Sequence, residues 1–173
     1  MAGRIPNDLR DGAIAAFRAA VMARLGVTPF THQREWMLAS EGWELGEAAS
    51  PGASEPTTTV QLPDQTVETR LVRPRVAGPA RFIADLGAFK VGKSFGAALW
   101  LSGFGAVPGA RVGLVGSEYA ICEPEFNYLC EFLLSSAGMG LKAESLQNRP
   151  RDGKLWLELP NGTKFEACSW ERR

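Results

Sequence analysis

The chain has 173 residues, of which 45% are hydrophobic and 22% are charged, and its formal net charge is zero. This length allows a domain with a real hydrophobic core, and the balanced charge excludes the overall basic field of many nucleic-acid-binding proteins. The three cysteines, Cys122, Cys130 and Cys168, show no CxxC spacing, and the single His32 has no metal-ligand companion nearby, so the sequence favours a reducing setting without a zinc site. It contains neither the apolar region of a signal peptide nor a stretch long enough to span a bilayer. We therefore expect a soluble intracellular protein.

Two amphipathic helices are predicted in the N-terminal part of the chain. The first runs from Leu9 to Leu25 and ends before Gly26, because its apolar residues recur at helical spacing. The second covers Thr31 to Trp43, with Thr31 as its N-cap. We take residues 1–43 as one segment on this basis.

Residues 44–80 have the composition of an insert. Gly46 to Pro56 is rich in small and polar residues and is predicted to be a mobile loop. The runs TTTVQL and TVETRLV, separated by PDQ, predict a β-hairpin. The cluster RLVRPR, with Arg70, Arg73 and Arg75, is either a DNA phosphate contact or, more commonly for such a run, a solvated loop.

From Arg81 onward, strands alternate with helices, which indicates an α/β fold. The expected strands are RFIADL and the buried run ARVGLVGS, and helices are predicted over Lys93 to Phe104 and Glu123 to Ser136, the latter with Pro124 in its first turn. The runs KLWLEL and TKFEACSW flank the hairpin signal Asn161-Gly162. We expect a parallel sheet with flanking helices over residues 81–173.

The stretch DLGAFKVGKSFG contains the P-loop pattern G-x-x-x-x-G-K-[ST] between an apolar strand and an apolar helix. Glycines let backbone N–H groups turn inward around phosphates, and the helix that begins at Lys93 directs its positive end toward them. Lys93 is expected to reach the β- and γ-phosphates of ATP, and the Ser94 hydroxyl to ligate Mg²⁺. The predicted phosphate-binding residues are Gly87, Ala88, Phe89, Lys90, Val91, Gly92, Lys93 and Ser94.

The acidic residue that most such ATPases use to hold Mg²⁺ is not evident after this loop. Asp85 lies on the strand that leads into the loop, so it cannot face the metal from a neighbouring strand. Glu118 follows GLVGS and is the best remaining carboxylate, although an acid at a helix N-terminus is the more ordinary interpretation. The chain therefore reads as a domain that stops before its second acidic site, and we expect little hydrolysis from it alone.

Four ordered pieces resemble the N-terminal ATPase domain of phage large terminase subunits, the motors that package DNA into capsids. They are PFTHQREW, the loop GAFKVGKS, the strand RVGLVGSEY and the hairpin LPNGTKFEACS. The resemblance implies a P-loop NTPase fold of the RecA/ASCE type, incomplete here, with N-terminal helices and a β-hairpin insert. It also implies that Gln33 contacts adenine, although an exposed helix residue is an equally good interpretation of Gln33.

The same resemblance implies a biological setting. Lys90 would be the additional basic residue of terminase loops, which often carry Arg where this chain has Phe89. The implied partners are double-stranded DNA, a portal protein and a small terminase subunit, without a membrane, in a ring-shaped homo-oligomer at full length. The implied location is the cytoplasm of a phage-infected or prophage-bearing bacterium, and the Walker B strand, catalytic Glu and nuclease domain would lie beyond Arg173.

Two alternatives share the same residues. A helicase-like nucleic-acid translocase has a similar Gln, loop and following strand, and its continuation would contain a second RecA-like domain. A nucleotide-binding module without turnover would use the loop for binding alone.

Overall fold

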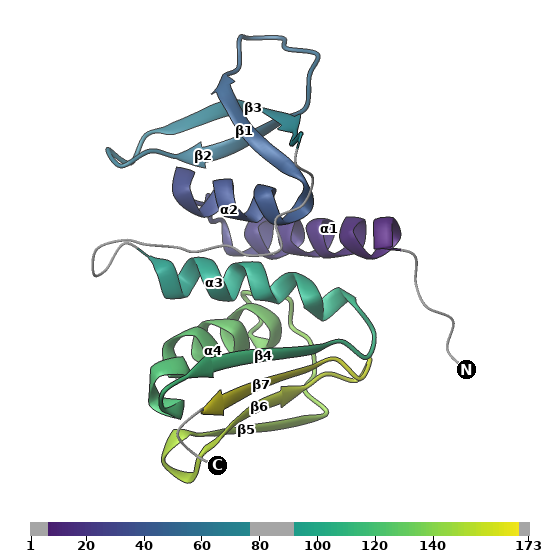
Figure 1. Cartoon of the computed structure of the whole chain (residues 1–173), viewed down its shortest axis with the longest axis vertical. Helices are drawn as coiled ribbons and strands as arrows, with labels where there is room; N and C mark the ends of the chain where they lie inside the picture. Colours follow the sequence, from purple (N-terminus) through teal and green to yellow (C-terminus); the bar gives the residue numbers. More distant parts are fainter. Residues whose placement is uncertain (1–6, 77–91, 170–173) are drawn as a thin grey trace. The chain divides into compact units, whose positions relative to one another are not determined.

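A computed structural model of the chain describes residues 7–76 and 92–169 (Figure 1). These residues form an α/β structure with four α-helices, a three-stranded sheet and a four-stranded mixed sheet. The chain divides into two compact units, Val27–Gly96 and Met1–Gly26 with Ala97–Arg173. Within the described residues, no helix combines the length and apolar character needed to cross a lipid bilayer.

The unit Val27–Gly96 contains helix α2 and an antiparallel sheet. Its elements are α2 (Thr31–Glu41), β1 (Trp43–Ala48), β2 (Thr57–Gln61) and β3 (Val67–Pro74), and the strand order is β1-β3-β2. Helix α2 packs against this sheet, as Figure 1 shows, and the unit's buried apolar side chains come from both: Met37, Leu38, Val60, Leu71 and Val72. The predicted hairpin is confirmed, since β2 and β3 pair from Thr57↔Leu71 to Gln61↔Val67.

The hairpin turn is closed by a side chain. The Asp64 carboxylate accepts hydrogen bonds from Thr66 N at 3.0 Å and Thr66 Oγ1 at 2.6 Å. These bonds stabilise the ionised carboxylate and lower the pKa of Asp64. The sequence PDQ therefore forms a turn because the short side chain of Asp64 accepts a hydrogen bond from the backbone two residues later, as is common for Asp in turns.

The second predicted helix is shorter than expected. Gly42 adopts a left-handed conformation (φ 85°) that ends α2, and its N–H donates to Ala39 O at 3.3 Å. The expectation that this helix extends to Trp43 is therefore wrong, because Trp43 begins β1 and is 36% exposed. The N-cap position belongs to Phe30 rather than Thr31. Part of the predicted loop, Gly46 to Ala48, is strand because β3 offers β1 a pairing edge.

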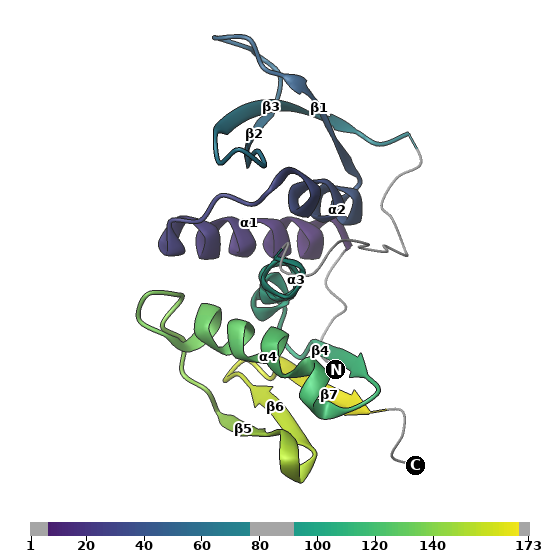
Figure 2. The same ribbon diagram turned by 90° about the vertical axis from the view of Figure 1, so that its left-hand side faces the viewer.

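The second unit places helices beside the four-stranded sheet. Its elements are α1 (Asn7–Leu25), most of α3 (Lys93–Ser102), the short 3₁₀ helix η1 (Gly103–Ala106), β4 (Arg111–Gly116), α4 (Tyr119–Leu134), β5 (Ser145–Arg149), the 3₁₀ helix η2 (Pro150–Asp152), β6 (Lys154–Glu158) and β7 (Lys164–Ser169). Figure 2 shows α4 lying along one face of this sheet. The core contains apolar residues of α4 and of the strands: Phe126, Leu129, Leu133, Leu114, Leu155, Leu157, Phe165 and Ala167.

The expected parallel sheet is mixed in the described residues. The strand order is β4-β7-β6-β5, in which β4 and β7 are parallel while the pairs β6–β7 and β5–β6 are antiparallel. The hairpin at Asn161-Gly162 is confirmed, and Gly162 has the positive φ (81°) that this turn requires. Strand β5 was not expected from the sequence, and the expected strand RFIADL lies outside the described residues.

Two further boundaries differ from the predictions. Helix α4 begins at Tyr119 rather than Glu123, so Pro124 lies inside the helix instead of in its first turn. The sulfur of Cys122 lies against Gly116 of β4, which explains why packing extends the helix toward its N-terminus. Strand β4 is not fully buried, because its residues alternate between the two faces and Val115 is 67% exposed.

Candidate functional site

The start of α3 directly follows a glycine in a left-handed conformation. Gly92 has a φ of 78°, a left-handed conformation that favours glycine, and the helix begins at the next residue, Lys93. Gly96 N–H donates to Gly92 O at 2.9 Å and closes the first helical turn. Lys93 and Ser94 are both partly exposed in that turn. The first two residues at the positive end of this helix dipole are therefore a lysine and a serine.

Gln33 of α2 connects two backbone segments of the same unit. Its Oε1 accepts a hydrogen bond from Phe30 N–H at 3.0 Å, and its Nε2 donates to Gly92 O at 2.8 Å. We call this pair of bonds the Gln33 bridge. Only 2% of the Gln33 surface is exposed, so the interpretation of Gln33 as an exposed helix residue is wrong. The prediction that Gln33 contacts adenine is not tested by this arrangement and stays a prediction.

The Phe30 end of the Gln33 bridge is attached to the sheet. Gln61 N–H donates to Pro29 O at 2.9 Å, Phe30 forms a β-bridge with Gln61, and Thr31 Oγ1 donates to Gln61 O at 3.4 Å. Phe30 O accepts the first helical hydrogen bond of α2 from Arg34 N–H at 2.9 Å. The Gln33 bridge therefore connects the carbonyl of Gly92 to the N-terminus of α2, which is itself hydrogen-bonded to the end of β2.

Gly96 is a site residue that sequence reasoning missed. A Cβ atom added at Gly96 would lie 3.0 Å from Gln33 Cγ and Nε2 and 3.1 Å from Trp36 Cζ2. The absence of a side chain on Gly96 thus lets α2 approach the first turn of α3. The available signal was a glycine in a predicted helix, four residues after Gly92, where glycine is otherwise unfavourable.

The remaining predicted loop residues, Gly87, Ala88, Phe89, Lys90 and Val91, lie outside the described residues, as does Asp85. Among the predicted site residues, the structure brings Gln33 into hydrogen-bond contact with Gly92. Lys93 and Ser94 follow Gly92 directly in the chain, as the first two residues of α3.

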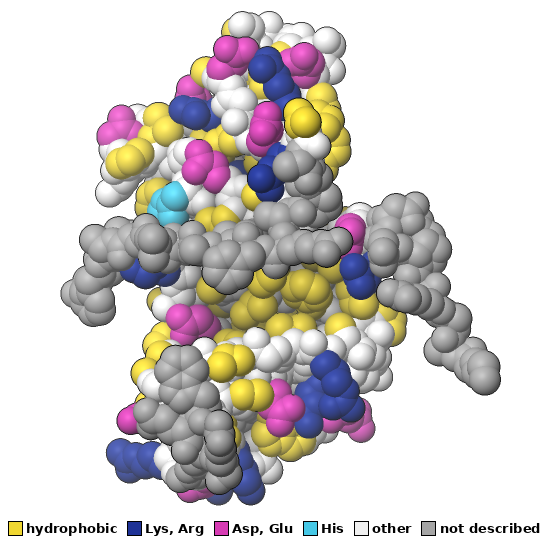
Figure 3. Space-filling model, viewed as in Figure 1, with side chains coloured by type: hydrophobic (Ala, Val, Ile, Leu, Met, Phe, Trp, Pro, Cys, Tyr) yellow, Lys and Arg dark blue, Asp and Glu magenta, His cyan; other side chains and the backbone are white. Residues whose placement is uncertain are grey.

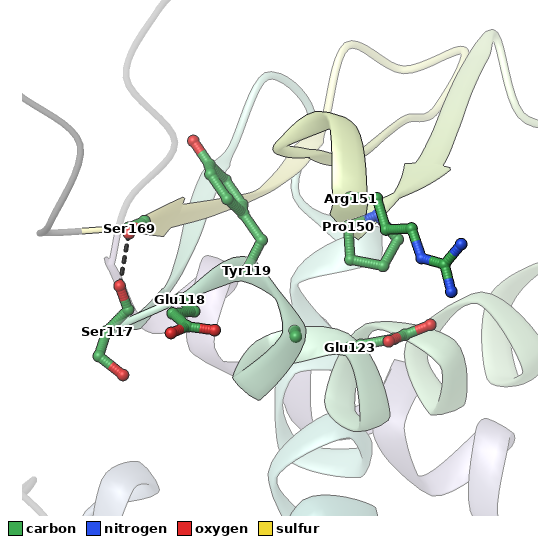
Figure 4. Close-up of a pocket in the computed structure, with 8 residues that line it drawn as sticks. Ser117, Glu118, Tyr119, Glu123, Pro150, Arg151 and Ser169 are labelled. Atoms are coloured by element: carbon green, nitrogen blue, oxygen red, sulfur yellow. Dashed lines mark hydrogen bonds between the residues drawn. The ribbon is translucent and has the colours of Figure 1, made fainter.

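A hollow lies at the carboxyl ends of the parallel strands β4 and β7. Its volume is about 570 Å³, and Figure 4 shows the residues that line it: Ser117, Glu118, Tyr119, Ala120, Glu123, Pro150, Arg151 and Ser169. Glu118 is the N-cap residue of α4, and Ser169 Oγ donates to Ser117 O at 2.6 Å. Two carboxylates on the α4 side oppose one guanidinium from η2. This mixed charge suits a polyphosphate less well than the start of α3 does.

The arginine cluster near β3 is balanced by acidic side chains. Arg70 Nε lies 3.0 Å from Glu68 Oε2, and Arg73 Nη2 lies 3.0 Å from Glu47 Oε1. On the face drawn in Figure 3, basic and acidic side chains are interspersed over this sheet. The cluster therefore presents less positive field to DNA phosphates than its sequence suggests.

The three cysteines are free thiols in the structure. Burial raises the pKa of Cys130 to about 11, and burial together with nearby Glu125 raises the pKa of Cys122, so neither forms a ready thiolate nucleophile. Among the described residues, no group of three or more His, Cys, Asp or Glu side chains is arranged to hold a metal ion.

Comparisons with known proteins give no match. No family model matches the chain, and no curated protein or solved structure resembles it at a significant level.

Proposed function

We propose that this chain binds ATP with Mg²⁺ through the loop Gly87 to Ser94. The observation that carries the proposal is the start of α3, where a left-handed glycine leads directly into a helix whose first two residues are Lys93 and Ser94. The sequence supplies the remaining glycine and spacing of the P-loop pattern. The α/β class of the chain is one in which such loops commonly occur.

Each residue would have a defined role in that complex. Backbone N–H groups of the loop would bind the phosphate oxygens, and Lys93 would neutralise the β- and γ-phosphates. The Ser94 hydroxyl would be a ligand of Mg²⁺, which prefers oxygen atoms and commonly bridges protein and phosphate. Bound Mg²⁺ would reduce the negative charge of the triphosphate. These residues account for binding and orientation of the nucleotide.

We further propose that the nucleotide serves a DNA-packaging motor, in which this chain is the N-terminal ATP-binding part of a large terminase subunit. The support is the order of four pieces along the sequence: the Gln33 segment, the loop, the strand RVGLVGSEY and the hairpin at Asn161-Gly162. Double-stranded DNA, a portal protein and a small terminase subunit are the proposed partners. Hydrolysis coupled to translocation would take place in the bacterial cytoplasm.

Calorimetric titration of the purified chain with Mg·ATP tests the binding proposal. Charge-assisted contacts to phosphate contribute about 1.5–3 kcal/mol each, so Lys93→Ala should weaken binding by at least about tenfold. Lys142→Ala is the matched control, because Lys142 is an exposed lysine that follows α4. An unchanged affinity for the Lys93 variant, or no binding by the wild-type chain, would remove the proposal.

A further inference from the structure

Both ends of the Gln33 carboxamide are already engaged. A Gln that reads adenine donates to N7 and accepts from the N6 amino group, which requires the same two ends of the amide. In this structure the donor end is bonded to Gly92 O and the acceptor end to Phe30 N–H. Simultaneous base reading would have to use the second hydrogen and the second lone pair of this amide, although only 2% of the Gln33 residue is exposed.

The carboxamide is also confined by its neighbours. A Cβ at Gly92 or at Gly96 would lie 3.0 Å from Gln33 Nε2, and the Trp36 ring borders the same position. Rotation of the amide toward a ligand would therefore break two hydrogen bonds in a tightly packed site.

Gly92 O accepts two hydrogen bonds, one from Gly96 N–H at 2.9 Å and one from Gln33 Nε2 at 2.8 Å. The first closes the opening turn of α3, and the second fixes the direction of that carbonyl relative to α2. Because Lys93 and Ser94 follow Gly92 directly, the orientation of the Gly92 peptide sets where their backbone N–H groups point.

We propose that Gln33 is a positioning residue that holds the Gly92 carbonyl, and through it the phosphate-binding start of α3, so that it supports triphosphate binding whatever the base. This inference rests on the proposed nucleotide function. In this proposal Gln33 supports phosphate binding indirectly and does not recognise adenine. It predicts that Gln33 variants lose affinity equally for all triphosphate ligands.

Hydrogen exchange of the nucleotide-free chain tests the positioning role by itself. Gln33→Met removes both hydrogen bonds at similar volume, and Gln33→Glu keeps an acceptor for Phe30 N–H but removes the donor to Gly92 O. In both variants the Gly96 amide should exchange about fivefold faster or more, because its turn has lost a supporting bond. Glu35→Gln, an exposed change on the same helix, should leave the exchange rate as it is. Unchanged exchange in both Gln33 variants would overturn the inference.

Calorimetry with three probes then separates phosphate positioning from base reading. We expect the neutral variant Gln33→Met to weaken binding of Mg·ATP, Mg·GTP and Mg·tripolyphosphate by the same factor, about fivefold or more. A loss confined to ATP would overturn the inference and establish adenine reading. If the wild-type chain binds none of the probes, the proposed function fails, while the exchange result still decides the role of Gln33.

A measurement on the wild-type chain covers the case in which the variants do not fold. Nuclear Overhauser contacts between the Gln33 side-chain amide and Gly96 should persist when the chain is saturated with Mg·ATP. Their replacement by contacts to the base protons would contradict the positioning role.

Discussion

At the scale of single residues, Gly96 allows a prediction whose sign depends on two opposing terms. Replacing a helical glycine by alanine normally stabilises a protein by about 1 kcal/mol. Here the new Cβ would lie 3.0 Å from two atoms of Gln33, and overpacking typically costs about 1–3 kcal/mol. Gln33 cannot shift cheaply because both ends of its amide are hydrogen-bonded. We therefore expect Gly96→Ala to lower the free energy of unfolding by about 1 kcal/mol.

Urea denaturation measures this difference. The control is Gly113→Ala in β4, where an added Cβ meets no atom within 4 Å, so stability should stay within about 0.5 kcal/mol of the wild type. A Gly96 variant as stable as the wild type would mean that Gln33 and Trp36 pack less tightly against α3 than the structure shows.

Two residues of the site show what could and could not be predicted from the sequence. The pattern that ends in Gly92, Lys93 and Ser94 predicted a helix beginning at Lys93, because glycine and helix-dipole rules act locally. The burial of Gln33 depends on Gly92, 59 positions later in the chain. No local rule contains that contact, and so the sequence left an exposed Gln33 and an adenine-reading Gln33 as equal alternatives.

At the scale of elements, Pro124 tests where α4 begins. The structure places Pro124 inside a helix that starts at Tyr119, where proline removes a hydrogen bond and disfavours the helix. Pro124→Ala should therefore raise the free energy of unfolding by about 1 kcal/mol or more. Thermal and urea unfolding check this expectation. A destabilised variant would support the sequence-based alternative, in which the helix begins at Glu123 and proline suits its first turn.

The hairpins were the elements most readily predicted. Both depend on turn chemistry within a few residues: Asp64 bonded to Thr66 in one, and Asn161-Gly162 in the other. The end of α2 and the start of β1 were predicted less well, because pairing with β3, such as that of Ala48 with Arg70, makes part of the predicted loop a strand. Helix and strand boundaries that depend on pairing with a distant segment cannot be predicted from the local sequence pattern.

At the scale of the whole molecule, the α/β class was predicted and the sheet topology was not. Alternating apolar strands and helices indicate the class, whereas strand order depends on which edges meet in space. The parallel pair β4–β7 sits beside the antiparallel strands β6 and β5, and β5 has a polar sequence that gave no strand signal. The predicted segments 1–43, 44–80 and 81–173 remain predictions of organisation, beside the two compact units that the structure shows.

The most direct test of the central claim is a nuclear magnetic resonance titration of the isotope-labelled chain with Mg·ATP. We predict that the backbone amides of Gly92, Lys93 and Ser94 shift and saturate together, because phosphate oxygens would accept hydrogen bonds at the start of α3. The amides of Glu118 and Ala120, beside the hollow of mixed charge, should not move. Shifts confined to that hollow, or none at all, would contradict the account.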